Sequence, residues 1–275
     1  MTIVFRDRRE AGRQLADRLA HYVGRADVTV LALPRGGVPV GFEVARRLRG
    51  PLDVFVVRKL GVPGCEEFAM GAIATGGVRV LNDEVVAGLA LPADIVDAVT
   101  AKEEQELRRR EGLYRKGRPP LRVDGRTVIL VDDGIATGST MLAAIRALRD
   151  HRPRRIVVAV PVGSPEICEA MRNDADEVVC AMMPELMIGV GRWYADFSQT
   201  SDGEVRALLA RAVREAAPPD DTASDHAGPR IVRDRSGRGR TDDVAAPMPA
   251  DQTAPPLVSA GTCPPGGSSS GRRTG

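Results

Sequence analysis

The sequence predicts an α/β fold, built on an open, mainly parallel twisted sheet that is flanked by helices. A short apolar run over 28–33 ends at a glycine turn, and a helical pattern over 39–48 and a second apolar run over 54–57 follow. Strand, turn, helix and strand in this order form the βαβ unit of parallel sheets. Aromatic residues make up only 3% of the chain, so the core is expected to consist of Val, Leu, Ala and Ile, as in parallel sheets.

Hydrophobic periodicity predicts the helices and strands of the first half of the chain. Apolar residues recur at steps of four from Ala11 to Val23, which indicates an amphipathic helix over 7–23 before the βαβ unit. After that unit, two short runs joined through Gly76-Gly77 predict a hairpin of 70–75 with 78–81. A charged helix is then expected over 92–110, with its ion pairs on a solvated face.

The hydrophobic pattern of the second half predicts three more strands, each followed by a helix. The strands are expected over 128–131, 156–162 and 177–182, and the helices over 141–149, 165–172 and 204–215. We therefore assign residues 1–216 to one folded domain. Residues 217–275 are dominated by Pro, Gly, Ser, Thr and Asp and contain apolar residues only singly. Such a segment buries too little apolar surface to offset its ordering entropy, so a disordered C-terminal tail is expected.

Composition narrows the classes of partner and compartment. A net charge of +2 is not the basic footprint of a nucleic-acid-binding protein, so no nucleic acid is expected. The four cysteines are scattered and never form C-x-x-C, so no metal-ligating residues are predicted. The first residues are charged too early for a signal peptide, and no apolar run could span a bilayer. These features predict a cytoplasmic protein without membrane contact.

The stretch over 128–140 contains the residues that are predicted to bind a ligand. Four apolar residues place Asp132 and Asp133 at the carboxyl end of a buried strand, where open α/β sheets bind ligands. A turn of small residues then opens onto a helix, whose first N–H groups and positive dipole end suit a phosphate. Two carboxylates beside a phosphate cradle suit a ligand that also offers hydroxyls or a bound cation, as a sugar phosphate does.

Three other interpretations of this stretch fit less well. A Walker A loop needs a longer spacing between its glycines and a lysine after the second, whereas Gly134 and Gly138 lie too close together and no lysine follows. A Walker B strand fits locally but has no partner loop. A purely structural turn with capping hydroxyls would leave two adjacent acids at a buried strand end without a role.

The segment VILVDDGIATGST at 128–140 resembles the phosphoribosyl pyrophosphate signature of type I phosphoribosyltransferases. It shares the four apolar residues, the two acids and the small-residue loop, and departs mildly at Gly134, where an apolar residue is usual. The resemblance extends over much of 7–215. The motifs RKLG, AIA and WYxDF are similar to those of an uncharacterised bacterial branch of the family, and they stand at 58–61, 72–74 and 193–197.

The resemblance implies a fold and a set of site residues. The fold would be that of type I phosphoribosyltransferases, an open parallel sheet with a small hood. Asp132 and Asp133 would hold the ribose hydroxyls and stabilise developing positive charge as the catalytic residues. The 5-phosphate would be bound by Ala136, Thr137, Gly138, Ser139 and Thr140, and the pyrophosphate by Arg35, Gly36, Gly37, Arg58 and Lys59. Trp193, Tyr194 and Phe197 would either stack on a base or fill the gap between hood and core.

The implied reaction displaces pyrophosphate from the anomeric carbon of phosphoribosyl pyrophosphate by a nitrogen nucleophile. Mg²⁺ would be held mainly by the ligand and by water, without an all-protein cage. Members that act on 6-oxopurines carry an Asp where this chain has Ala136. Because alanine cannot exchange a proton with the base, the acceptor is expected to be a nucleobase other than a 6-oxopurine, or another small nitrogenous molecule.

Two further functions stay open at this point. A non-catalytic sensor of phosphoribosyl pyrophosphate usually carries a nucleic-acid-binding module, and no helix-turn-helix precedes residue 28. Synthesis of phosphoribosyl pyrophosphate needs two tandem domains, and one copy is present. A homodimer is also left open. A Mg²⁺-dependent transferase is the leading prediction.

Overall fold

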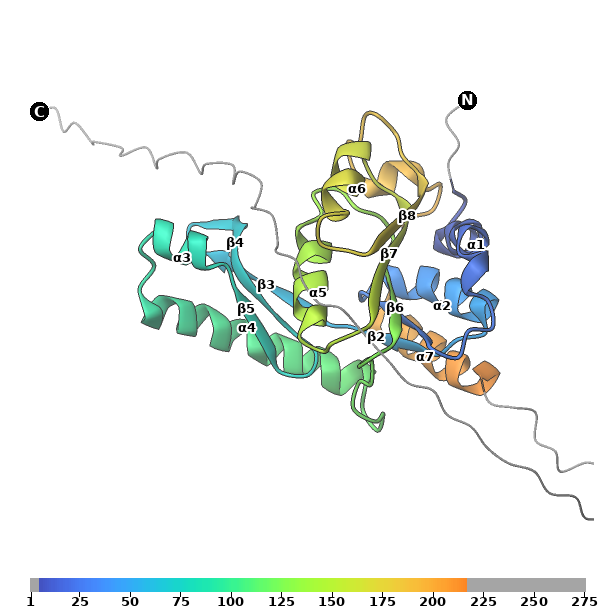
Figure 1. Ribbon diagram of the computed structural model, residues 1–275, viewed down its shortest axis with the longest axis horizontal. Coiled ribbons are helices and arrows are strands. Elements are labelled where there is room, and N and C mark those ends of the chain that lie inside the picture. The colour runs from blue at the N-terminus through green and yellow to red at the C-terminus, as the bar shows by residue number, and fades with distance from the viewer. Residues whose placement is uncertain (1–4, 217–275) are drawn as a thin grey trace, which may run out of the picture. The chain divides into compact units, whose positions relative to one another are not determined.

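Five parallel strands form the central sheet of the computed structural model, which describes residues 5–216 (Figure 1). Their order across the sheet is β2-β1-β6-β7-β8, and every neighbouring pair runs parallel. The strands are β1 (Val28–Ala32), β2 (Leu52–Val54), β6 (Thr127–Val131), β7 (Arg155–Val162) and β8 (Glu177–Met182). The predicted α/β class and parallel sheet are therefore confirmed, and the predicted tail over 217–275 lies outside the described residues.

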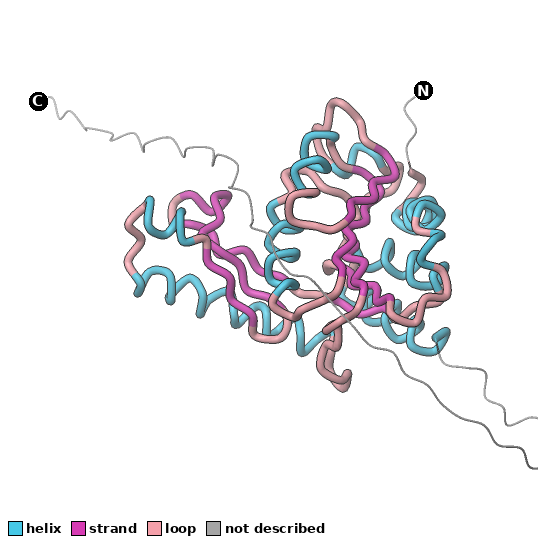
Figure 2. The backbone as a smooth tube through the Cα atoms, viewed as in Figure 1, coloured by secondary structure: helices cyan, strands magenta, loops and turns pink. Residues whose placement is uncertain are grey.

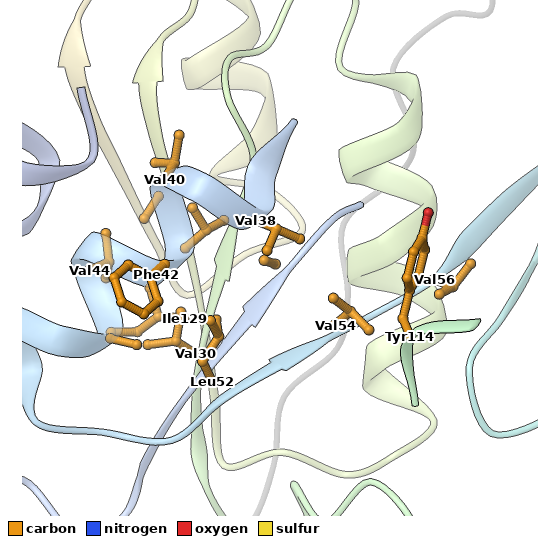
Figure 3. Close-up of a cluster of buried hydrophobic side chains, with 14 of the residues drawn as sticks. Val30, Val38, Val40, Phe42, Val44, Leu52, Val54, Val56, Tyr114 and Ile129 are labelled. Carbon is orange, nitrogen blue, oxygen red and sulfur yellow. The ribbon is translucent and has the colours of Figure 1, made fainter. Parts of the chain in front are cut away.

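Helices cover both faces of this sheet (Figure 1). One face carries α1 (Arg8–Arg18), α2 (Gly37–Leu48) and α7 (Asp202–Ala216), and the other carries α5 (Ser139–Arg149) and α6 (Pro165–Met171). Two short 3-10 helices, Ala20–Tyr22 and Val190–Trp193, follow α1 and β8 in the chain. Figure 3 shows part of the first core, where Val30 and Ile129 of the sheet face Phe42 of α2.

The core has two halves because successive side chains of a strand point to opposite faces. In β6, Ile129 and Val131 belong to the cluster under α1 and α2, whereas Val128 and Leu130 belong to the cluster under α5 and α6. All five residues of β6 are buried, as expected for a strand covered on both faces.

A second sheet of three antiparallel strands lies between α4 and α5, beside the central sheet (Figures 1 and 2). It comprises β3 (Val57–Val62), β4 (Cys65–Ala74) and β5 (Val78–Leu81), and α3 (Asp83–Gly88) and α4 (Ala93–Tyr114) follow it. The hairpin predicted around Gly76-Gly77 is confirmed by the pairing of β4 with β5. The helix α3 was not predicted.

The single strand predicted over 54–57 is wrong, because the chain changes sheets within it. Phe55 N–H donates to the carbonyl of Ala32 in β1 (3.0 Å), whereas Val56 N–H donates to Thr75 Oγ1 beside the second sheet (2.9 Å). Both residues are fully buried. An apolar run looks the same whether its hydrogen bonds go to one sheet or to two, so periodicity could not detect the change.

The sheet grows in opposite directions from the boundary between β1 and β6. The strand that follows β1 in the chain, β2, lies on one side of β1, and β6 and the later strands lie on the other. The connections after β1 and β6 consequently leave on opposite faces of the sheet, to α2 and α5. Ligands of open α/β sheets bind at such a point, outside the carboxyl ends of the strands. The loops that follow Ala32 and Val131 therefore form the expected binding edge.

Candidate functional site

Asp132 and Asp133 follow β6 directly and are both half-buried. Asp133 N–H donates to Asp132 Oδ1 at 2.8 Å, so the backbone turns back on the first carboxylate. Burial raises the pKa of both carboxyls, and the neighbouring Asp133 charge raises that of Asp132 further. Two adjacent acids with raised pKa values at a strand end are typical of a functional site.

The loop after β1 packs directly against these acids. A Cβ atom on Gly36 would collide with the Asp133 carboxylate, and one on Gly37 would lie 2.7 Å from the Val131 carbonyl oxygen. Only glycine permits this approach at both positions. The peptide bond between Pro34 and Arg35 is cis. The structure thus brings the predicted pyrophosphate loop and the predicted catalytic acids into contact.

The loop over 136–140 opens onto α5 as predicted. Gly138, the residue before the helix, has a φ of 78°, a left-handed conformation that favours glycine, and no side chain caps the helix. Thr137 Oγ1 and Ser139 Oγ lie 3.3 Å apart, and Thr137 is exposed. The helix start therefore presents backbone N–H groups and hydroxyls at the binding edge, which is the arrangement that binds phosphate.

The departure from the family pattern at Gly134 has a structural reason. A Cβ atom on Gly134 would lie 2.6 Å from Val190 Cγ1 and 2.9 Å from Val162 Cγ1. Val190 begins the 3-10 helix of the segment after β8. That segment therefore packs onto the loop of the acids and fills the space that a larger side chain at 134 would need.

Arg8 at the start of α1 is a site residue that the sequence analysis missed. Its Nε donates to Asp133 Oδ2 at 2.8 Å, and its Nη1 donates to the Ser198 carbonyl at 2.7 Å. The Arg8 and Asp133 side chains are only 11% and 15% exposed. The Arg8 charge opposes the effect of burial on the pKa of Asp133. Position 8 lies 125 residues before Asp133, and no local pattern marks it.

The three aromatic residues after β8 differ in their surroundings. The buried Tyr194 donates its hydroxyl to the Asp133 carbonyl at 2.5 Å, and burial raises the pKa of this hydroxyl. Trp193 packs in the same cluster with Phe5. Phe197 is exposed, and its ring centre lies 3.9 Å from the Arg8 guanidinium carbon. Tyr194 and Trp193 thus fill the gap beside the acids, and Phe197 presents a ring at the surface.

The basic residues predicted to bind pyrophosphate are divided between two places. Arg35 lies in the loop after β1, and its Nη1 is 3.7 Å from Asp202 at the start of α7. Arg58 and Lys59 lie inside β3 of the second sheet. Arg58 Nε donates to Glu103 Oε2 of α4 at 2.7 Å. The structure therefore engages Arg58 in an ion pair with α4, and the sequence analysis did not predict this partner.

Neither a cation cage nor a membrane span is found between residues 5 and 216. In this range, no three His, Cys, Asp or Glu side chains are grouped so that they could hold a metal ion. No helix there has the length and apolar character needed to cross a bilayer.

Comparison with known proteins places the chain in a family. Residues 7–192 match the family model of the phosphoribosyl transferase domain. A Mycobacterium tuberculosis protein that carries the name of a phosphoribosyl transferase is 50% identical over 246 residues. The match covers 90% of this chain but 54% of that protein, so the chain spans about half the length of this curated relative. The bifunctional protein PyrR of Chloroflexus aurantiacus is 33% identical over 129 residues, which are 46% of this chain and 65% of that protein.

A solved structure agrees with both the fold and the sequence match. The crystal structure of the protein TT1426 from Thermus thermophilus is 46% identical and superposes with a TM-score of 0.70. The match covers 76% of this chain and 98% of that chain.

Proposed function

We propose, for a chain that belongs to the phosphoribosyltransferase family, that it transfers the ribose 5-phosphate group of phosphoribosyl pyrophosphate to a nitrogenous small molecule and releases pyrophosphate. The observation that carries this proposal is the contact between the loops after β1 and β6. Gly36 lies against Asp133, so a pyrophosphate on the first loop and a ribose on the second would meet at one anomeric carbon. Positioning of this kind is the main contribution that a transferase can make to such a displacement.

Each group of the site then has a role in the proposed reaction. The N–H groups and hydroxyls at the start of α5 would bind the 5-phosphate, and the backbone of Gly36 and Gly37 with Arg35 would receive the pyrophosphate. Asp132 and Asp133 would accept hydrogen bonds from the ribose hydroxyls. Their charge would stabilise the oxocarbenium-like transition state as the glycosidic bond to pyrophosphate breaks.

Mg²⁺ fits this arrangement as an ion that enters with the ligand. Asp132 and Asp133 offer carboxylate oxygens, which are the protein ligands that Mg²⁺ prefers, and phosphate oxygens and water would complete its shell. When bound, the ion would neutralise charge on the departing pyrophosphate. These two carboxylates would add to a shell that the ligand and water mainly supply.

Arg8 sets a condition on substrate binding. Its guanidinium already occupies Asp133 Oδ2, so a ribose hydroxyl that binds Asp133 must share this carboxylate with Arg8 or displace it. The same ion pair favours a second candidate function, a non-catalytic sensor, because a neutralised Asp133 would stabilise a developing cation less. Binding of phosphoribosyl pyrophosphate without turnover would identify the sensor.

The proposal also concerns which molecule accepts the ribose 5-phosphate group. Ala136 is exposed at the binding edge and has no group that exchanges a proton with N7 of a 6-oxopurine. A well-placed general acid or base contributes roughly a hundred- to ten-thousandfold in rate. Hypoxanthine, guanine and xanthine are therefore expected to be poor acceptors.

The deciding experiment combines ligand binding with turnover. Phosphoribosyl pyrophosphate with Mg²⁺, at about a hundred times its Kd, should stabilise the protein by about 2.7 kcal/mol in thermal unfolding. Ribose 5-phosphate at the same concentration should stabilise it less, because it lacks the pyrophosphate. A screen of nucleobases for pyrophosphate release would then identify the acceptor. No stabilisation by either ligand would end the proposal, and hypoxanthine turnover equal to that of the best acceptor would end its acceptor part.

A further inference from the structure

A cleft of about 720 Å³ lies between the end of α4, the loop that follows it and α7. Clefts of roughly 300–1,000 Å³ are the size class that binds small organic ligands. None of the residues that line this cleft is acidic, and three are cations. The lining residues used below are Leu113, Tyr114, Lys116, Arg118, Arg206 and Val213.

Two of the three cations are available to a ligand. Lys116 and Arg206 are exposed, and no ion pair or hydrogen bond joins either side chain to another residue within 5–216. Arg118 differs, because it donates to the carbonyls of Leu52 and Leu209 and lies 3.3 Å from Asp53. Arg118 therefore fixes the wall of the cleft, while Lys116 and Arg206 offer donors that could bind an anion.

The rest of the lining suits an apolar body attached to that anion. Val213 on α7 is 57% exposed and lines the cleft. Leu113 lies partly exposed on α4. Tyr114 is buried, and its hydroxyl donates to Asp202 at 2.5 Å, so its ring is held in a fixed position in the wall. A flat or apolar group between α4 and α7 would cover Leu113 and Val213.

We propose that this cleft is a second ligand site, which binds a small organic anion with a phosphate group and a flat apolar body. Lys116 and Arg206 would bind the phosphate, and Leu113 and Val213 would contact the body. The site also has a direct connection to the proposed phosphoribosyl site. Tyr114 holds Asp202, and Asp202 lies 3.7 Å from Arg35 of the proposed pyrophosphate loop. A ligand against Tyr114 would therefore act on Asp202, the partner of Arg35.

Pyridoxal 5′-phosphate is a suitable probe, because it combines a phosphate, a flat ring and an aldehyde. The aldehyde condenses with a lysine amine to an imine with loss of water, and borohydride delivers a hydride to the imine carbon to give a stable amine. The chain has only three lysines, Lys59, Lys102 and Lys116, so peptide mass spectrometry assigns every adduct. Lys102 is exposed on α4 and is the internal control for random modification.

In the full chain, we expect labelling of Lys116 to saturate with probe concentration and to be reduced by adenosine monophosphate, while labelling of Lys102 rises linearly. Arg206→Gln should raise the half-saturating concentration at Lys116 about tenfold, because it removes one charged hydrogen-bond donor. Arg214→Gln, on the same helix but outside the cleft lining, should leave it unchanged.

Linear labelling of Lys116 at the rate of Lys102 would overturn the proposal, as would equal half-saturation in Arg206→Gln and in the wild type. The result does not depend on transferase activity. An adduct at Lys59 on β3 lies outside the cleft lining and is scored separately, so the two proposals fail independently.

Discussion

The junctions after β6 and β7 occupy equivalent places on adjacent parallel strands, and yet they end their strands in opposite ways. After β7, Ser164 Oγ accepts the N–H of Ile167 at 3.2 Å, and Pro165 at the first helical position has no N–H to satisfy. The start of α6 is therefore capped by the serine that precedes it and begins with a proline that needs no partner.

After β6 the corresponding helix start has no such cap. No side chain caps α5, the preceding Gly138 is left-handed, and two acids stand at the strand end. A helix start without a cap and a pair of half-buried carboxylates both reduce stability. The comparison teaches that an uncapped helix start beside two half-buried acids supports a candidate binding site independently of the loop sequence.

The capped junction after β7 also supports the uncapped junction after β6. A Cβ atom on Gly138 would lie 2.7 Å from Met171 Cε and 3.0 Å from Ile167 Cγ2, and both of these residues belong to α6. The helix whose start is capped thus forms the wall behind the candidate phosphate loop over 136–140. Substitutions separate the roles of the two junctions, and the largest effect is expected at the acids.

Asp133→Asn should reduce turnover on the order of a hundredfold, because it keeps the shape of the side chain and removes a charge that faces the oxocarbenium-like transition state. Steady-state kinetics of pyrophosphate release measures this loss, and thermal unfolding checks that the variant folds. Unchanged turnover would remove Asp133 from the reaction and the β6 junction from the site.

Substituting the serine of one junction should change ligand affinity alone, and substituting the serine of the other should change stability alone. Ser139→Ala should weaken binding of phosphoribosyl pyrophosphate about tenfold, because it removes a hydroxyl donor to a charged phosphate, and should leave stability unchanged. Ser164→Ala should lower stability by about 1 kcal/mol through loss of the cap and should leave affinity unchanged. Calorimetric titration and denaturant unfolding of both variants test this, and effects of the same kind in both would contradict the comparison.

Asp132→Asn should raise the melting temperature at pH 7. Burial and the Asp133 charge raise the pKa of Asp132 in the folded state, so the native protein binds more protons than the unfolded chain and loses stability as pH rises through that window. Asparagine removes this penalty. The gain should be largest near neutral pH and should shrink as pH falls to the unfolded pKa. Asp150→Asn, at an exposed position after α5, is the control and should show no such pH-dependent gain.

The smallest effect is expected at Arg8. Its charge lowers the pKa of Asp133 against the effect of burial, so Arg8→Gln should raise that pKa and move the acid limb of the kcat/KM profile to higher pH. Arg9→Gln changes the adjacent exposed arginine and should leave the limb in place. An acid limb that stays in place or moves to lower pH in Arg8→Gln would show that the ion pair does not control the ionisation of Asp133.

Local patterns determined most of the fold and the centre of the site. The apolar run of β6, the acids and the small-residue loop lie within thirteen consecutive positions, 128–140. Their chemistry follows from the conformations that those residues favour, because a buried strand must end before polar side chains and a helix start leaves N–H groups free. The order of most strands and helices is predictable for the same reason, since hydrophobic periodicity is visible within a short window of consecutive residues.

Only the tertiary structure decided which distant residues complete the site. Arg8 reaches Asp133 across 125 positions, Val190 fills the space above Gly134, and Phe55 and Val56 take their hydrogen-bond partners from different sheets. Each of these contacts depends on how separate elements pack. A charged residue at a helix start or a valine in a loop has the same local sequence whether it faces solvent or a carboxylate, so the sequence could supply the residues but not their partners.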